Sequence, residues 1–144
     1  SLVTRFSEFE LPHWRSRAEI DNANFEALQK AMRQPEAGAQ ILIAEDEHKT
    51  PLGFIHLQTQ MDYFNGEKQG YISDLAVKQG VEGHGVGRRL LDAAEAWAKE
   101  EGFGLLTLYV FAANNHARSI YEKYGFKPEV IKYARTVEKK DGDP

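Results

Sequence analysis

The apolar positions along the chain follow two periods, one typical of helices and one typical of strands. A period of three to four residues predicts helices at residues 23–34, 85–101 and 115–124. Short runs rich in β-branched and aromatic residues predict five strands, at residues 39–45, 52–60, 70–77, 105–111 and 130–137. Helices and strands therefore alternate in the second half of the chain.

Capping residues mark where the helices begin and end. Asp21 or Asn22 is a candidate N-cap of the first helix, and Pro35 follows its end. Gly102 provides a C-terminal stop for the second helix, and Asn114 is a candidate N-cap of the third.

The run at 105–111 is almost continuously apolar, which is typical of a strand covered on both faces. It follows the strand at 70–77 after one intervening helix. We therefore expect a right-handed βαβ unit with two parallel strands.

Composition limits the classes of protein to be considered. The 144 residues suit one domain, expected over 1–137, and the charged tail at 138–144 is expected to be disordered. A net charge of −4 without a basic run argues against a nucleic-acid partner. No apolar stretch reaches the roughly 20 residues that a membrane span needs, so we expect no membrane partner and a cytoplasmic protein.

The same composition argues against a metal centre. The chain has no cysteine, which excludes a disulfide framework and a thiolate nucleophile. Its five histidines lack the spacing typical of metal ligands, so no metal is expected.

A loop rich in glycine lies between the strand at 70–77 and the helix at 85–101. Gly80, Gly83, Gly85 and Gly87 allow a ligand to approach the backbone closely. The helix that follows presents unpaired N–H groups and partial positive charge at its first turn. The segment therefore predicts an anion cradle, most simply for a phosphate group.

This loop can be compared with three types of phosphate-binding loop, and it could also be a plain surface turn. A mononucleotide P-loop would require Lys-Ser or Lys-Thr after the glycines, and neither is present. A dinucleotide fold would require Gly-x-Gly-x-x-Gly and an acidic residue at the end of the next strand. Here the spacing is Gly-x-Gly-x-Gly, and residues 110–114 at the end of that strand include no acid. The run from Glu82 to Gly87 instead resembles the Arg/Gln-x-x-Gly-x-Gly/Ala loop of the GNAT N-acetyltransferases. It departs from that loop at Glu82, whose carboxylate must point away from a pyrophosphate or pair with a cation such as Arg88 or Arg89.

A second segment supports the resemblance. Residues 114–126 are similar to the Asn-x-x-Ala-x-x-x-Tyr-Glu-Lys-x-Gly-Phe pattern of the same family, in the expected order downstream of the loop. The resemblance covers roughly residues 40–137. It implies an α/β (α+β) fold with a mixed, mostly antiparallel twisted sheet flanked by helices. It also implies a first strand near residues 1–10, which these residues match poorly, so that strand is expected to be absent.

The resemblance further implies acetyl-CoA as the acyl-donor cosubstrate. Backbone N–H groups of the loop would hold its pyrophosphate, at Gly83, His84, Gly85, Val86, Gly87 and Arg88. The free edge of the preceding strand, at Leu75, Ala76 and Val77, would pair with the pantetheine arm, and Asn114 and Ala117 would line the other side.

Two residues are candidates for the chemistry of direct acetyl transfer to a primary amine. Tyr121 matches the family's tyrosine and would act as general acid, although it could instead only pack the helix. Asp74 is a candidate general base, since strand alternation places it opposite Leu75 and Val77. Glu45 and ordered water are alternatives to Asp74.

The acceptor is less well defined. By resemblance its pocket involves residues 1–35 and 60–70, which are rich in aromatic and acidic side chains. These could bind a cationic amine or could serve only the core and the surface. A small-molecule amine, a polyamine, a lysine and a peptide N-terminus all stay open, and a homodimer is possible. A catalytically silent coenzyme-A-binding module is the alternative function.

Overall fold

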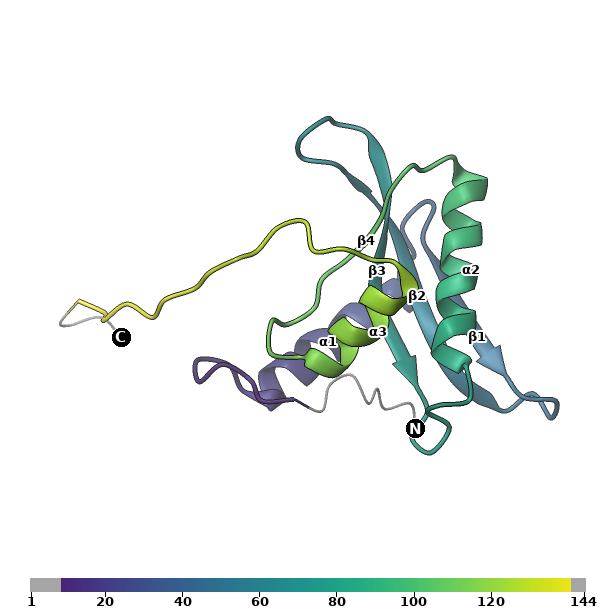
Figure 1. The fold of residues 1–144 in the computed structure, drawn as a ribbon, viewed down its shortest axis with the longest axis horizontal. Coiled ribbons are helices and arrows are strands. Elements are labelled where there is room, and N and C mark those ends of the chain that lie inside the picture. Colours follow the sequence, from purple (N-terminus) through teal and green to yellow (C-terminus); the bar gives the residue numbers. More distant parts are fainter. Residues whose placement is uncertain (1–8, 141–144) are drawn as a thin grey trace.

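A four-stranded sheet organises residues 9–140, the part of the chain that the computed structural model describes (Figure 1). Its strands are β1 (Gln40–Glu45), β2 (Pro51–Met61), β3 (Lys68–Val77) and β4 (Leu106–Leu108). Three helices complete this part of the chain, α1 (Arg17–Arg33), α2 (Val86–Glu101) and α3 (Asn115–Tyr124).

The strands lie side by side in chain order, β1-β2-β3-β4. β1 and β2 are antiparallel, as are β2 and β3, whereas β3 and β4 are parallel. The parallel pair is the one that α2 connects, as the sequence predicted. The mixed, mostly antiparallel sheet with helices confirms the predicted fold class.

The main hydrophobic core lies between α2 and the sheet. The apolar face of α2 is buried against the core-facing side chains of β2 and β3. Gly70 allows a close approach in this layer, because a Cβ there would lie 2.8 Å from the Trp97 ring and 3.0 Å from Leu106. A larger residue at position 70 would therefore push α2 or β4 away from β3.

The first helix starts earlier than the sequence suggested. α1 begins at Arg17 and is capped by Ser16, whose Oγ accepts from the Glu19 N–H while the Glu19 carboxylate accepts from the Ser16 N–H. The predicted caps Asp21 and Asn22 were wrong, because this reciprocal pair satisfies two helix-end donors one turn earlier. The helices predicted at 85–101 and 115–124 match α2 and α3, and Asn114 caps α3 as predicted.

The strand predicted at 105–111 is shorter and more exposed than its apolar sequence implied. Only Leu106–Leu108 pair with β3. Tyr109 is 83% exposed, and Val110 and Phe111 are also exposed. The expectation of a strand covered on both faces was wrong, because β4 lies at the edge of the sheet and turns away after three residues.

The last predicted strand does not form. Residues 125–140 have no regular secondary structure, and Val130, Ile131 and Tyr133 are exposed. In Figure 1 this segment runs away from the sheet. The prediction was wrong because an apolar, β-branched run becomes a strand only when a partner strand supplies a ladder. The strand considered near residues 1–10 falls almost wholly outside the described residues.

Candidate active site

β3 and β4 separate halfway along β3. Their parallel pairing covers Gly70, Tyr71 and Ile72 and ends there. Within residues 9–140, no strand pairs with the edge of β3 that faces away from β2 beyond Ile72. The predicted coenzyme residues Leu75, Ala76 and Val77 all lie on this stretch, and all three are buried. The free edge can therefore accept an extended ligand as if it were another strand.

The glycine-rich loop continues from this edge to the start of α2. Gly83 and Gly85 have φ angles of 85° and 79°, in the left-handed region that favours glycine. Gly85 is the N-cap of α2, and no side chain of the described residues caps this helix start. The first turn of α2 also has no acidic residue. The first N–H groups of α2, at Val86, Gly87 and Arg88, are therefore suited to an anion.

Two charged side chains, one in the loop and one in the first turn of α2, have partners within the protein. Oε2 of Glu82 accepts a hydrogen bond of 2.8 Å from the Gly80 N–H. The guanidinium of Arg88 lies over the Tyr124 ring, 5.6 Å from its centroid. Glu82 therefore helps to shape the turn that precedes α2. His84, which was predicted to contribute a backbone N–H, donates that N–H to the Val81 carbonyl at 3.3 Å.

Asn114 and Ala117, predicted to line the other side, lie at the start of α3. Asn114 Oδ1 accepts from the Ala117 N–H at 3.2 Å, and both residues are buried. Their first role is thus to begin α3 where the chain returns from β4. That start fixes the position of Tyr121, about two turns further along α3.

Tyr121 is largely buried between α3 and the main core. Its ring meets Phe126 edge-on at 5.9 Å and packs against the cluster that includes Leu75 and Val77. Burial raises the pKa of Tyr121 to about 12, so its hydroxyl keeps its proton throughout the physiological range. The structure therefore places a proton donor on the core side of the free strand edge.

A polar cluster that the sequence did not predict joins α2 to α3. The Tyr124 hydroxyl donates to Asp92 at 2.7 Å and lies 3.1 Å from Glu95. Beside it is a hollow of about 200 Å³, lined by Arg88, Leu91, Ile120, Lys123 and Tyr124. The sequence offered no signal for this pairing, because the two helices are separated by β4 and a long loop.

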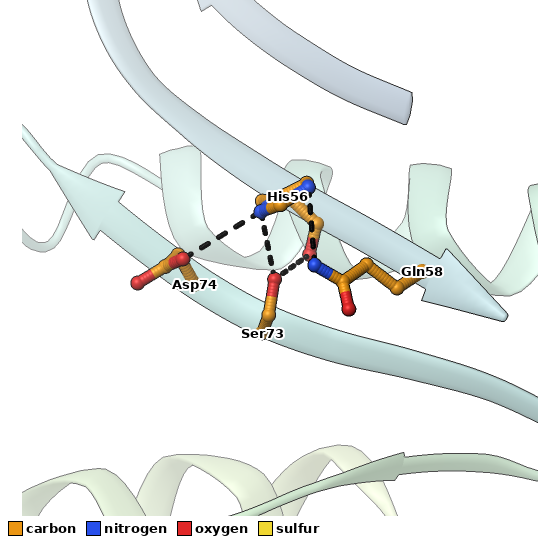
Figure 2. A network of polar contacts seen from close by, with 4 residues as sticks. All are labelled: His56, Gln58, Ser73 and Asp74. Carbon is orange, nitrogen blue, oxygen red and sulfur yellow. Dashed lines mark hydrogen bonds and ion pairs between the residues drawn. The ribbon is translucent and has the colours of Figure 1, made fainter. Parts of the chain in front are cut away.

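Asp74 lies on the opposite face of β3 from the core, as strand alternation predicted. Its Oδ2 is 3.7 Å from Nδ1 of His56, on β2 (Figure 2). Burial raises the pKa of the Asp74 carboxyl, and the neighbouring imidazole of His56 partly opposes this rise. A carboxylate with a raised pKa is a better proton acceptor than one on the surface.

Some acidic residues in the regions expected to form an acceptor pocket instead stabilise a helix start and a turn. The carboxylate of Glu19 is part of the α1 cap, and Asp62 accepts from the Phe64 N–H in the turn after β2. Tyr63 and Phe64 are exposed at the tip of this turn, where their rings meet edge-on at 5.4 Å. These residues do not form a cage around a cation.

Among the described residues, no group of three or more histidine, aspartate or glutamate side chains is placed to hold a metal ion. No helix in this part of the chain has the length and apolar character needed to cross a bilayer.

Comparison with known proteins agrees with the geometry. The model of the acetyltransferase (GNAT) family matches residues 4–126. An uncharacterized N-acetyltransferase, YhfO of Bacillus subtilis, is 30% identical over 89% of this chain and 80% of its own length. A mycothiol acetyltransferase of Propionibacterium freudenreichii is 40% identical over 88 residues, and this chain spans 28% of its length.

Solved structures show the same arrangement of strands and helices. A putative acetyl transferase from Pyrococcus furiosus superposes with a TM-score of 0.72 at 28% identity, over 92% of this chain and 85% of that one. The family supports the predicted enzyme class, an acetyl-CoA-dependent N-acetyltransferase. With the family match covering the sheet, the glycine loop and α3, this chain belongs to the GNAT family of acetyltransferases.

Proposed function

We propose that this protein transfers an acetyl group directly from acetyl-CoA to a primary amine. The observation that carries this proposal is the unpaired edge of β3 leading into an uncapped, glycine-rich helix start. The helix N–H groups suit the pyrophosphate, and the strand edge suits the amide-containing pantetheine arm. One run of backbone, from Leu75 to Arg88, can therefore bind two chemically different parts of one coenzyme.

Acetyl-CoA supplies the acetyl group and a thiolate leaving group. During transfer a C–N bond forms, the C–S bond breaks, the amine gives a proton to Asp74, and Tyr121 gives a proton to the sulfur. The positions of the two residues support these roles. Tyr121 packs against the core cluster to which Leu75 and Val77 belong, whereas Asp74 projects from the other face of β3. Base and acid would thus act from opposite sides of the acetyl group.

The acceptor we propose is a small-molecule or peptide amine that reaches the Asp74 face of β3. Tyr71 lies close enough to Asp74 to feel its charge, and its ring meets that of Tyr109 edge-on at 5.8 Å. Aromatic rings beside a carboxylate favour an ammonium group over an anionic acceptor. The similarity to a mycothiol acetyltransferase makes amines related to mycothiol a reasonable member of the first panel.

A catalytically silent coenzyme-A-binding module is the second candidate. Glu82 favours it, because its carboxylate lies in the turn that leads into the cradle, where it accepts the Gly80 N–H. A fixed negative charge there would weaken pyrophosphate binding and slow turnover.

Two measurements separate the candidates. Acetyl-CoA at 100 times its dissociation constant should raise the free energy of unfolding by about 2.7 kcal/mol, and both candidates require this. Release of free thiol in the presence of a panel of amines is expected only of the enzyme. Stabilisation without thiol release for any amine would favour the silent module, and absence of stabilisation would refute both.

A further inference from the structure

A buried histidine faces the proposed base, although no sequence pattern indicated this contact. His56 lies in the middle of β2 and is 1% exposed. The residues on either side, Ile55 and Leu57, point into the main core, so His56 points to the opposite face. A buried polar side chain costs free energy unless it is hydrogen-bonded, and His56 has several partners.

A β-bulge brings these partners together. His56 pairs with Asp74, but Leu57 pairs with Ile72, so Ser73 and Asp74 together oppose His56. The side chains of Ile72 and Leu75 both enter the core, and the bulge leaves Ser73 and Asp74 between them on the other face. Figure 2 shows both side chains directed at the imidazole.

The hydrogen bonds assign the proton of His56 to Nδ1. The Gln58 amide nitrogen, a donor, lies 3.5 Å from Nε2. The Ser73 hydroxyl donates to the His56 carbonyl at 3.4 Å, which leaves Oγ to accept from Nδ1–H at 2.8 Å. Nδ1–H therefore points between Ser73 Oγ and Asp74 Oδ2, which is 3.7 Å away.

We propose that His56 is a positioning residue that keeps the Asp74 carboxylate ionised and oriented toward the free edge of β3. This inference rests on the proposed function, in which Asp74 is the base. The Asp74 side chain retains 19% exposure, so an amine can reach the carboxylate from one side while Nδ1–H supports it from the other. Without His56, burial alone would favour the protonated carboxyl, which cannot accept a proton.

Other titratable groups around Asp74 do not reproduce this effect. Tyr71 lies on the same strand, and Tyr109, which follows β4, contacts its ring. Burial raises the pKa of Tyr71 above its ordinary value, with further contributions from Tyr109 and Asp74. Tyr71 is therefore neutral wherever the carboxylate titrates, and a change on removal of His56 can be assigned to that residue.

The test compares two variants of His56. His56→Leu removes the Nδ1 donor, while His56→Asn retains an N–H near the same position. The Asp74 carboxyl is followed by ¹³C NMR titration of protein labelled at aspartate Cγ, with Asp74→Asn identifying the resonance. We expect titration at higher pH in His56→Leu and near-normal titration in His56→Asn. An unchanged titration in His56→Leu would overturn the proposal, whether or not the protein transfers acetyl groups.

Kinetics give the second readout. For His56→Leu we expect kcat/KM to fall by about tenfold or more at pH 6 and to recover at higher pH. If Asp74→Asn keeps the wild-type pH profile, the proposed role of Asp74 fails. If Asp74→Asn loses the acidic limb of the pH profile but His56→Leu leaves that limb unshifted, only the role of His56 fails. If His56→Leu does not fold, Gln58→Leu is used instead, because it removes the amide that lies beside Nε2 of His56. This variant must move the acidic limb of the pH profile in the same direction as expected for His56→Leu. An unmoved acidic limb would refute the proposal.

Discussion

Individual residues explain most of the chemistry proposed for this site. Tyr121 and Asp74 were both predicted from the sequence, and the structure places them on opposite faces of β3. The environment of each residue differs in a way that the sequence did not specify. Tyr121 is embedded in aromatic and aliphatic side chains, whereas Asp74 is buried beside an imidazole. The first environment keeps the Tyr121 hydroxyl protonated. In the second, the imidazole of His56 partly opposes the rise that burial causes in the pKa of the Asp74 carboxyl.

Replacing Tyr121 tests its role as general acid. Tyr121→Phe removes the hydroxyl but keeps the ring that meets Phe126 and the core. We expect turnover to fall by about 10²-fold or more, because general-acid catalysis contributes about 10²–10⁴. The dissociation constant of acetyl-CoA, measured by isothermal titration calorimetry, should change less than twofold. Unchanged turnover would leave Tyr121 with a packing role only.

The same hydroxyl predicts a dependence of stability on alkaline pH. The pKa of Tyr121 is about 12 in the folded protein, above its ordinary value of 10. The folded state therefore binds this proton more tightly, and the stabilisation is complete below pH 10 and lost as pH rises toward 12. Urea unfolding should show a decline of about 1–3 kcal/mol over this window. Tyr121→Phe should show a smaller decline, and an equal decline would contradict the burial of the hydroxyl.

At the scale of elements, the start of α2 and the end of β3 form the binding backbone. Gly85 combines a left-handed conformation with the N-cap position, so it sets the direction in which the first N–H groups of α2 point. This local feature was predictable because glycine, loop and helix are adjacent in the sequence. The free edge of β3 was implied only by the family resemblance, since it depends on where β4 leaves the sheet.

An alanine at position 85 tests the cradle. A Cβ at Gly85 meets no atom within 4 Å, so the cost of Gly85→Ala comes from its φ of 79°. We expect a loss of about 1–2 kcal/mol in unfolding free energy or, if the turn rearranges, weaker binding of acetyl-CoA. Gly104→Ala is the matched control, because that position is also open and its φ is not left-handed. Equal behaviour of the two variants in calorimetry and urea unfolding would argue against the cradle.

At the scale of the whole molecule, burial is uneven. The interior lies between α2 and the sheet, whereas α1 has no buried residue and residues 125–140 lie outside the sheet. The exposed apolar side chains of this last segment, Val130, Ile131, Tyr133 and Val137, therefore contribute little to the core.

Hydrogen exchange tests this distribution. Amides of residues 127–140 should exchange close to the unprotected rate, while those of β2 and β3 in the core should exchange by global unfolding. Exchange is measured by mass spectrometry at a low and a high protein concentration. The comparison of the two concentrations is the control for association between copies. Protection of residues 130–137 at both concentrations would contradict the described fold, and protection only at high concentration would indicate pairing between copies.

The sequence by itself determined the features that depend on neighbouring residues. The periodicity of apolar residues predicted α2 and α3, Asn114 was predicted as a cap, and the glycines predicted the loop. Each of these features depends only on residues that are close together in the sequence. The Ser16–Glu19 cap is equally local, since its Ser-x-x-Glu spacing is that of a capping box, although Asp21 and Asn22 were the predicted caps. The family motifs added the acetyl-CoA interpretation and the candidate Tyr121, and strand alternation added the candidate Asp74.

Only the tertiary structure decided what depends on partners distant in the chain. The apolar run at 130–137 reads as a strand, yet it needs a ladder neighbour that the described fold does not provide. The run at 105–111 reads as buried, yet an edge strand is covered only where it pairs. His56 joins Ser73 and Asp74 because one bulge changes the register between β2 and β3. Register depends on long-range pairing, so no local pattern encodes it.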